Sequence, residues 1–379
     1  MIGEVRIENY KSIQKLKLEL GRVTVLIGEN GCGKSNILEA IALASAAADD
    51  KLDNEFLASR GIRVTEPQLM RSAFEKENLD KDISIEIRGN NDTIKIRFIL
   101  NNDNTPYARW RNHFYYGISE EERNLERAYR PLAAWEYNSF LDSRDRQYQF
   151  IRKTNIKTLK IQEFIIYSPE NIALRTFEKE GQIQPLGING EGLFKLLKVL
   201  NSDNQEQLNE INKKLQLIDW FQDFEAPPNL SSIQNSLQIK DRYLDPDLAY
   251  FDQRSSNEGF LFLLFYFALF ISDITPKFFA IDNIDASLNP RLCRRLMQEL
   301  VELAKKQDKQ VIFTTHNPAV LDGLDLGDEE QRLFVIYRSQ LGHTKAIRIL
   351  KPKPLEGQEP VKLSEAFLRG YIGGLPENF

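Results

Sequence analysis

Residues 28–35, which read GENGCGKS, constrain the fold of this chain more than any other segment. Gly28, Gly31 and Gly33 permit a tight backbone turn whose conformations a larger side chain would block. The apolar run VTVLIG leads into the turn and the alanine-rich run SNILEAIALASAAA leaves it, which predicts a buried strand, a loop and a helix. Such a loop presents backbone N–H groups and a helix N-terminus to phosphate groups. The sequence therefore predicts an α/β fold around a phosphate-binding loop.

An acidic residue follows another apolar strand much later in the chain. Residues 277–283 read KFFAIDN, which places the Asp282 carboxylate where it can face Mg²⁺ through water. Lys34 is expected to reach the β- and γ-phosphates, and the Ser35 hydroxyl to bind Mg²⁺ with Asp282. The predicted cofactors are thus ATP and Mg²⁺. The other nucleotide-binding positions predicted in and after the loop are Glu29, Asn30, Gly31, Cys32, Gly33 and Asn36.

Three further motifs accompany these two. Residues 256–259 read SNEG and open a long apolar helix, 287–290 read SLNP, and 314–316 read TTH at the end of the strand QVIFTT. The N–H groups near Ser256 and Gly259 can face a γ-phosphate held by a second copy of the chain, and His316 can hydrogen-bond that phosphate. Three of the predicted site residues also have a structural reading: Ser256 as a helix N-cap, His316 as a structural histidine and Asp282 as a turn or capping residue.

In chain order, these motifs resemble the P-loop, signature, Walker B, D-loop and switch histidine of ABC-type ATPases of the SMC/RecF kind. The opening IENYKSI…LELGRVTVLIGENGCGKSNILEAI is similar to RecF and OLD-like ATPases. The segments PLGINGEGLFKLLKVL and LSEAFLRGYIGGLPENF resemble the AAA_15/AAA_21 group, many members of which belong to bacterial antiphage systems. The resemblance covers both ends of the chain and little of its middle. It implies a dimeric head with two ATP molecules at its interface and a separate effector, such as a nuclease.

Two departures from the resemblance bear on mechanism. In most ATPases of this type a glutamate follows the Walker B aspartate as general base, whereas this chain has Asn283. An amide orients water but accepts no proton, and general-base catalysis contributes about 10²–10⁴-fold, so hydrolysis should be slow. Asp285 is the nearest candidate to replace the base, and it can equally be a cap of the following turn. Because about sixty residues follow His316, no Toprim nuclease domain of the OLD type is expected, and nuclease activity is expected to come from a separate partner.

Composition sets the remaining expectations. A net charge of -5 and a pI near 5.6 give no overall attraction to nucleic acid. Two cysteines, Cys32 and Cys293, offer no disulfide framework, and with no signal peptide visible the expected location is the cytoplasm. The apolar run 260–271 is shorter than the roughly 20 residues of a membrane helix, so it is expected to be a buried helix with no role in a membrane.

The chain is expected to form one α/β head built from both of its ends. Residues 1–100 carry the P-loop half, including an antiparallel β-subdomain, and residues 241–379 carry the signature, Walker B and switch half. Residues 101–240 are expected to form an inserted, mainly helical lobe, with two helices within 190–224. In 107–153, nine basic residues and several aromatic ones accompany seven acidic ones, which favours an ordinary solvated face over a nucleic-acid or partner surface. The Q-loop has no clear sequence position.

Three functions remain compatible with the sequence. The first is an ATP-held dimeric switch that controls a separate effector, in particular a nuclease, in an antiphage complex. The second is a RecF-like ATPase that binds DNA. The third is a binding module whose ATP is structural and never hydrolysed.

Overall fold

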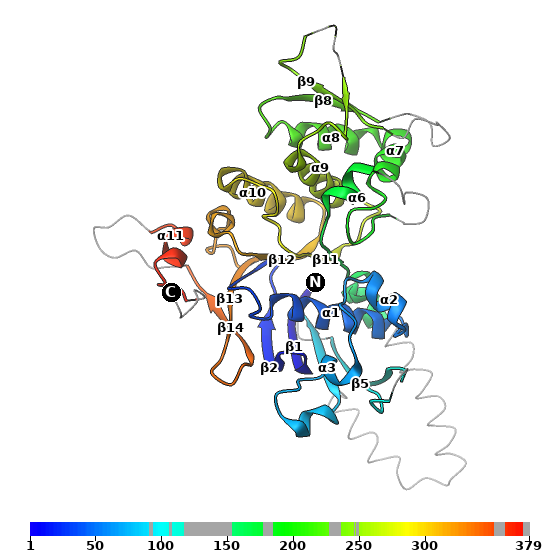
Figure 1. The fold of residues 1–379 in the computed structure, drawn as a ribbon, viewed down its shortest axis with the longest axis vertical. Coiled ribbons are helices and arrows are strands. Elements are labelled where there is room, and N and C mark those ends of the chain that lie inside the picture. Colours follow the sequence, from blue (N-terminus) through cyan, green and yellow to red (C-terminus); the bar gives the residue numbers. More distant parts are fainter. Residues whose placement is uncertain are drawn as a thin grey trace.

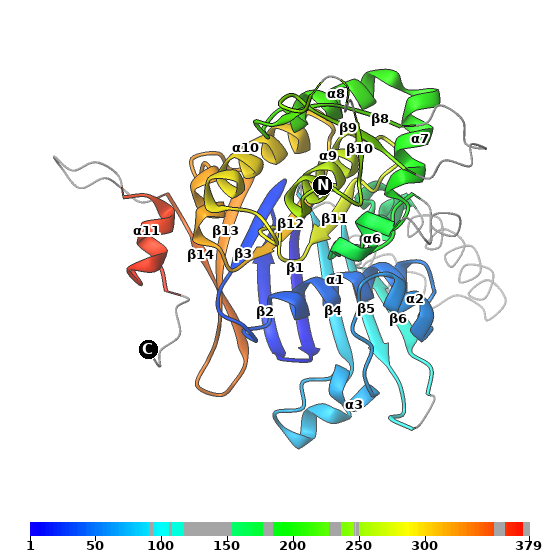
Figure 2. The same cartoon turned by 45° about the horizontal axis from the view of Figure 1, so that its top comes forward.

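The protein is described by a computed structural model, whose ribbon is shown in Figures 1 and 2. The described residues are 1–90, 94–105, 108–116, 154–176, 185–226, 236–245, 247, 250–351 and 361–373. Their strands form three sheets, one of six strands, one of five and one of three.

The central sheet has the strand order β14-β13-β3-β12-β11-β7. Its strands are β3 (Val23–Ile27), β7 (Ile166–Tyr167), β11 (Phe278–Ile281), β12 (Gln310–Thr315), β13 (Gln331–Arg338) and β14 (Thr344–Ile349). All neighbours pair in parallel except β13 and β14, which form an antiparallel hairpin. The carboxyl ends of five parallel strands therefore lie along one edge, where α/β sheets typically bind their ligands.

The amino-terminal sheet is antiparallel throughout, in the order β2-β1-β4-β5-β6. Its strands are β1 (Ile2–Tyr10), β2 (Ile13–Glu19), β4 (Ile83–Gly89), β5 (Lys95–Asn101) and β6 (Arg111–Tyr116). Helix α1 (Lys34–Ala48) packs between this sheet and one face of the central sheet. Buried apolar residues alternate with more exposed ones along β5 and along part of β1 and β2, so one face joins this core and the other carries charges.

Helices α9 (Glu258–Ile271) and α10 (Pro290–Lys306) pack on the opposite face of the central sheet. All twelve residues of the run 260–271 are buried, which confirms the expected buried helix. Within the described residues, no helix is both long and apolar enough to span a membrane. Helix α10 is instead amphipathic and buries one face, with Leu296 and Leu300 among its core residues.

The described part of residues 101–240 contains more helix than strand, and it also contributes strands to the sheets of the head. Strand β6 extends the amino-terminal sheet and β7 is the edge strand of the central sheet. Two helices are present as predicted, α7 (Leu193–Asp203) and α8 (Gln205–Leu215), with a break at Asn204. The prediction that helix continues to residue 224 is wrong, because β8 (Phe221–Glu225) pairs with β9 (Gln238–Asp241), which pairs with β10 (Phe251–Asp252). Long-range pairing decided these assignments.

The remaining elements are short. They are α2 (Asn54–Ser59), α3 (Pro67–Met70), α6 (Asn171–Thr176), α11 (Leu363–Leu368) and the 3₁₀ segments η1 (Lys76–Leu79), η2 (Ile161–Glu163) and η3 (Pro318–Gly323). Helix α6 packs against α9, and α11 packs on η3. The Ser364 hydroxyl donates to the Asp322 carboxylate at 2.7 Å, which joins α11 to the segment that follows β12.

Candidate nucleotide site

The loop between β3 and α1 has the geometry of a phosphate cradle. A Cβ at Gly33, whose φ is 107°, would lie 2.1 Å from the Thr344 hydroxyl, and one at Gly28 would lie 2.1 Å from the Ile336 carbonyl oxygen. Only glycine fits at these positions. Gly33 is also the N-cap of α1 and offers no side-chain acceptor to the first turn of the helix. The free N–H groups and the helix dipole there fit a polyphosphate.

Lys34 is buried and points back into this loop. Its ammonium donates to the carbonyl oxygens of Gly28 at 2.9 Å and of Glu29 at 3.0 Å, and lies 3.4 Å from His316 Nδ1. Burial is the largest influence on Lys34 and lowers its pKa. A phosphate near this ammonium would supply the negative charge that neutral carbonyls do not.

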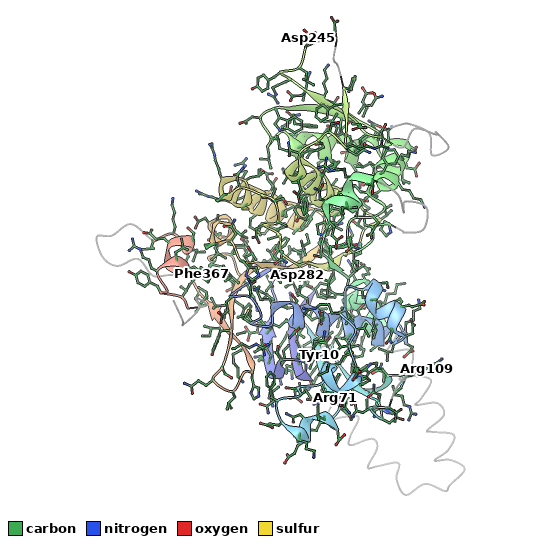
Figure 3. The ribbon with its side chains drawn as sticks, in the orientation of Figure 1. Tyr10, Arg71, Arg109, Asp245, Asp282 and Phe367 are labelled. Atoms are coloured by element: carbon green, nitrogen blue, oxygen red, sulfur yellow. The ribbon has the colours of Figure 1, made fainter. Side chains whose placement is uncertain are left out.

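Ser35 and Asp282 meet although they are far apart in the sequence. The Ser35 hydroxyl donates to Asp282 Oδ2 at 2.9 Å, and the Thr314 hydroxyl donates to Asp282 Oδ1. Asp282 is half-buried at the end of β11, and Figure 3 shows it near the centre of the molecule. A hydroxyl and a carboxylate in contact are the donor set that holds Mg²⁺ beside a nucleotide, so this pair fits the predicted cofactor.

Asn283 follows Asp282 in the left-handed conformation, with φ of 58°, and is exposed. Its backbone N–H donates to the Thr314 hydroxyl at 2.9 Å. Asp285 accepts a 2.6 Å hydrogen bond from the Thr315 hydroxyl, and its charge acts on both Lys34 and His316. Asp285, the candidate to replace the missing glutamate, is thus oriented toward the site by a residue of β12.

His316 lies directly after β12, where the sequence placed it. Partial burial, followed by the charge of Lys34, lowers the pKa of His316 below its ordinary value. The imidazole is therefore neutral at pH 7, and one ring nitrogen remains available as a hydrogen-bond donor. This state suits contact with a phosphate oxygen.

The SNEG segment lies at the start of α9, as predicted, but its cap is not Ser256. Asn257 is the N-cap and accepts from the Phe260 N–H at 2.8 Å. Ser256 is buried, and Gly259 lies in the first turn of α9 beside Ser287. Among the described residues, no hydrogen bond joins Ser256 or Gly259 to Lys34 or Asp282 of the same chain. These two groups of predicted site residues are therefore not brought together within one copy.

Sequence motifs missed a pocket that adjoins the loop. Its volume is about 410 Å³, and its lining residues are Lys11, Ser12, Asn36, Arg63, Thr65, Leu69, Arg71, Ala73, Phe74 and Arg338. The Arg338 guanidinium donates to the Gly31 carbonyl at 2.9 Å and lies over the Phe74 ring. A pocket with an aromatic wall and cations, next to a phosphate cradle, suits the base and ribose of a nucleotide. Of its lining residues, Asn36 alone was among the predicted nucleotide-binding positions.

Hydroxyl and amide groups join this pocket to the loop. The Asn36 amide donates to the Ser12 hydroxyl at 2.6 Å, and that hydroxyl lies 2.7 Å from the Thr344 hydroxyl. Thr344 also donates to the carbonyl of Cys32 at 2.8 Å. Cys32 is buried and burial raises the pKa of its thiol, so its local role is packing. Of the remaining predicted loop positions, Asn30 is an exposed turn residue.

Two other regions add no residue to this site. A larger cavity of about 770 Å³ lies between α2, β7 and residues 185–191 and is lined by none of the predicted ATP-binding residues. Most of the basic and aromatic region 107–153 lies outside the described residues. Within the described part, Trp110 is buried and stacks against the Arg71 guanidinium at 5.0 Å, so it offers no exposed stacking surface.

Similarity to known proteins agrees with this geometry. A family model described as "AAA domain, putative AbiEii toxin, Type IV TA system" matches residues 23–322. The chain is 40% identical over 67 residues to the uncharacterized protein MJECL10 of Methanocaldococcus jannaschii, covering 16% of this chain and 31% of that protein. It is 38% identical over 55 residues to the DNA replication and repair protein RecF of Bacillus thuringiensis, covering 14% and 15%. The chain thus spans less than a third of each of these relatives.

Solved structures show the same fold at low sequence identity. An SMC head bound to the C-terminal winged-helix domain of ScpA has a TM-score of 0.57 and 16% identity, covering 92% of this chain and 98% of that one. An SMC head from Pyrococcus furiosus, bound to the C-terminal domain of ScpA, has a TM-score of 0.51 and 15% identity, covering 92% and 96%. ATPases of this family generally use ATP with Mg²⁺ and hydrolyse it. The family model covers well over half of the chain, which therefore belongs to the AAA_21 family and has the fold of an ABC-type P-loop ATPase head of the SMC/RecF kind.

Proposed function

We propose that this protein is an ATP-gated switch that dimerises around ATP, hydrolyses it slowly and controls a separate effector in bacterial antiphage defence. Lys34 and the loop glycines hold the phosphates, Ser35 and Asp282 hold Mg²⁺, and His316 contacts the γ-phosphate. The family resemblance favours a nuclease as this effector.

The observation that carries the slow-hydrolysis proposal is the side chain at position 283. Asn283 is exposed beside Asp282, where its amide can orient a water molecule but cannot remove a proton from it. Asp285 is the candidate to act in its place, because Thr315 orients it and its charge reaches Lys34 and His316. With Asn283 in place of a general base, the site is expected to hold bound ATP for a long time before it is hydrolysed.

Dimerisation is supported by the separation of the two halves of the site within one chain. The first turn of α9, which contains Gly259, presents the N–H groups of a helix N-terminus, a kind that binds anions, whereas the Ser256 N–H already donates to the Gln253 carbonyl at 3.3 Å. These groups make no hydrogen bond to Lys34 or Asp282 among the described residues of one copy. A second copy can supply them to the γ-phosphate.

The test compares ATP hydrolysis by the wild type, Asn283→Glu and Lys34→Ala. We expect Asn283→Glu to raise the turnover rate by about 10²-fold, because it restores a general base, and Lys34→Ala to abolish ATP binding. A wild-type turnover as fast as that of Asn283→Glu contradicts the slow switch. A single-turnover experiment in which wild type forms no ADP instead supports structural ATP.

Control of an effector is tested by purifying the tagged protein from its native cells with and without ATP. We expect a second protein to co-purify in an ATP-dependent ratio with wild type and not with Lys34→Ala. A ratio of co-purifying protein that is the same with and without ATP, and the same for Lys34→Ala, contradicts ATP gating.

A RecF-like role in DNA maintenance is the second candidate, and the similarity to RecF over 55 residues favours it. It predicts ATP-dependent binding to duplex DNA that weakens steeply as salt increases. The absence of such binding at low salt removes this candidate.

A further inference from the structure

The loop before α9 is held in place by a single arginine from another element. Arg175, in α6, donates from its guanidinium to the backbone carbonyl oxygens of Gln253 at 3.4 Å, Arg254 at 2.5 Å and Ser256 at 2.9 Å. These carbonyls belong to the turn that leads into the SNEG segment. One side chain thus binds three successive parts of the loop.

The guanidinium is itself oriented by its own helix. Arg175 Nε donates to the Asn171 side chain at 3.0 Å, one helical turn earlier. The contact is also reciprocal, because the buried Gln253 side chain donates to the Arg175 carbonyl at 3.4 Å and accepts from the Leu237 N–H at 2.9 Å. Hydrogen bonds from a charged donor are stronger than neutral ones. Helix α6 and the loop are therefore expected to move as one unit.

The other end of α6 reaches the nucleotide site through β7. The Tyr167 carbonyl at the end of β7 accepts from the Asp282 N–H at 2.8 Å. Only Ser168, Pro169 and Glu170 separate that strand from α6. A continuous path of backbone and hydrogen bonds thus runs from the Mg²⁺-binding carboxylate to the loop before α9. Figures 1 and 2 both place α6 beside α9.

We propose that Arg175 is a positioning residue that links the state of the nucleotide at Asp282 to the position of the SNEG segment, and so to ATP-dependent assembly with a second copy. The proposal rests on the dimeric switch described above. Arg175 contacts neither Asp282 nor the phosphate-binding loop through any hydrogen bond among the described residues, so it is not a catalytic residue. Its substitution is expected to affect assembly and turnover and to leave ATP binding by the single copy intact.

The chain offers a matched control in Arg242. Its guanidinium also donates to a backbone carbonyl, that of Phe221 at 2.6 Å, and to the Gln216 side chain at 3.0 Å. This contact joins the end of α8 and β8 to the residue that follows β9, and among the described residues the Arg242 side chain makes no hydrogen bond to residues 253–256. Arg242→Gln therefore removes an arginine–carbonyl contact of the same chemistry without touching α6.

The experiment measures three quantities for wild type, Arg175→Gln, Arg175→Lys and Arg242→Gln. They are ATP affinity, ATP-dependent dimerisation by light scattering, and the change in hydrogen exchange of residues 253–260 when ATP binds. We expect Arg175→Gln to keep ATP affinity within about twofold, to weaken dimerisation at least tenfold, and to lose the exchange response. Arg175→Lys should retain part of the dimerisation and part of the exchange response, and Arg242→Gln should match wild type in all three quantities.

Wild-type dimerisation and a wild-type exchange response in Arg175→Gln would overturn the proposal. So would a parallel loss of ATP affinity in Arg175→Gln, since the residue would then serve the fold of the binding site. If the wild type itself does not dimerise with ATP, the proposed dimeric switch is wrong. The exchange response of residues 253–260 then still decides whether Arg175 links the nucleotide site to the SNEG segment. Circular dichroism establishes that each variant is folded, and Arg175→Lys replaces Arg175→Gln as the deciding variant if the latter is not.

Discussion

Thr314 and Thr315, adjacent at the end of β12, each orient one acidic side chain of the site. Thr314 donates to Asp282 and Thr315 donates to Asp285. A hydroxyl that donates to a carboxylate fixes the direction of that side chain. Successive side chains on a strand point to opposite faces, so the two carboxylates are held separately, one beside Ser35 and the other toward His316.

Asp285→Asn tests whether this carboxylate replaces the absent general base. We expect the single-turnover rate of ATP hydrolysis to fall by about 10²-fold with ATP affinity unchanged, because a base contributes to the chemical step. Asp325→Asn, which alters an exposed turn, serves as the control. In an Asn283→Glu background the same Asp285→Asn change should have little effect. An unchanged rate in the wild-type background assigns Asp285 to the turn alone.

His316 gives the site a dependence on pH whose sign follows from its lowered pKa. The unfolded chain takes up a proton as the pH falls through about 6.5, whereas folded His316 does so only at lower pH. Acidification through this window therefore destabilises the folded protein. We expect the unfolding temperature of His316→Gln to fall less than that of wild type between about pH 7.5 and pH 5.5. Parallel curves for the two proteins contradict a lowered pKa of His316.

Helix α9 is anchored at its carboxyl end by a buried lysine. The Lys309 ammonium donates to the carbonyl oxygens of Leu269 at 2.6 Å and Ser272 at 2.8 Å, and to the Thr275 hydroxyl at 2.5 Å. A cation suits the end of a helix, where carbonyl groups lack intrahelical partners. Because α9 carries the SNEG segment at its other end, this anchor supports the same element that the proposed dimer uses.

Lys309→Met is expected to lower the free energy of unfolding by about 3 kcal/mol, because the Leu269 and Ser272 carbonyl groups must then share the single hydroxyl proton of Thr275. The control is Lys306→Met, which removes an exposed ion pair with Glu210 and should cost less than about 1 kcal/mol. Urea denaturation followed by circular dichroism measures both. Equal effects of the two substitutions contradict the anchoring role.

The whole head is assembled from both ends of the chain. Strand β3 lies between β12 and β13, so sequence-distant strands complete the sheet around the phosphate-binding loop. Arg338 and Thr344, from the β13–β14 hairpin, hold the carbonyl groups of Gly31 and Cys32. The loop geometry thus requires the carboxyl-terminal third of the chain.

Removal of residues 331–379 is expected to abolish cooperative folding and ATP binding, because β3 loses a neighbouring strand and the loop loses both holding side chains. Removal of residues 361–379 is the matched control. It deletes α11, whose Phe367 packs at the edge of the core, away from Asp282 in Figure 3. This shorter deletion should lower stability while ATP binding is retained. ATP binding by the longer deletion contradicts the requirement.

Local patterns predicted most elements of the head but not their partners. The alternating β1 and β2, the buried β3, β11 and β12, and α10 agree with the sequence expectations. The sequence expectations did not include the pairing of β6 and β7 with the head sheets or the pairing of β8 with β9. Strand formation there depends on pairing with distant segments, which a local pattern does not record.

The sequence by itself determined the fold class and the motifs, because glycine conformations, apolar periodicity and strand-terminal polar residues are local properties. It also named Asn283 as the point on which the mechanism depends. Tertiary structure alone decided which polar groups meet: Ser35 with Asp282, Thr315 with Asp285, and Arg175 with the loop before α9. These partners lie far apart in the chain, and only the register of the parallel sheet and the packing of α6 on α9 bring them within hydrogen-bond distance.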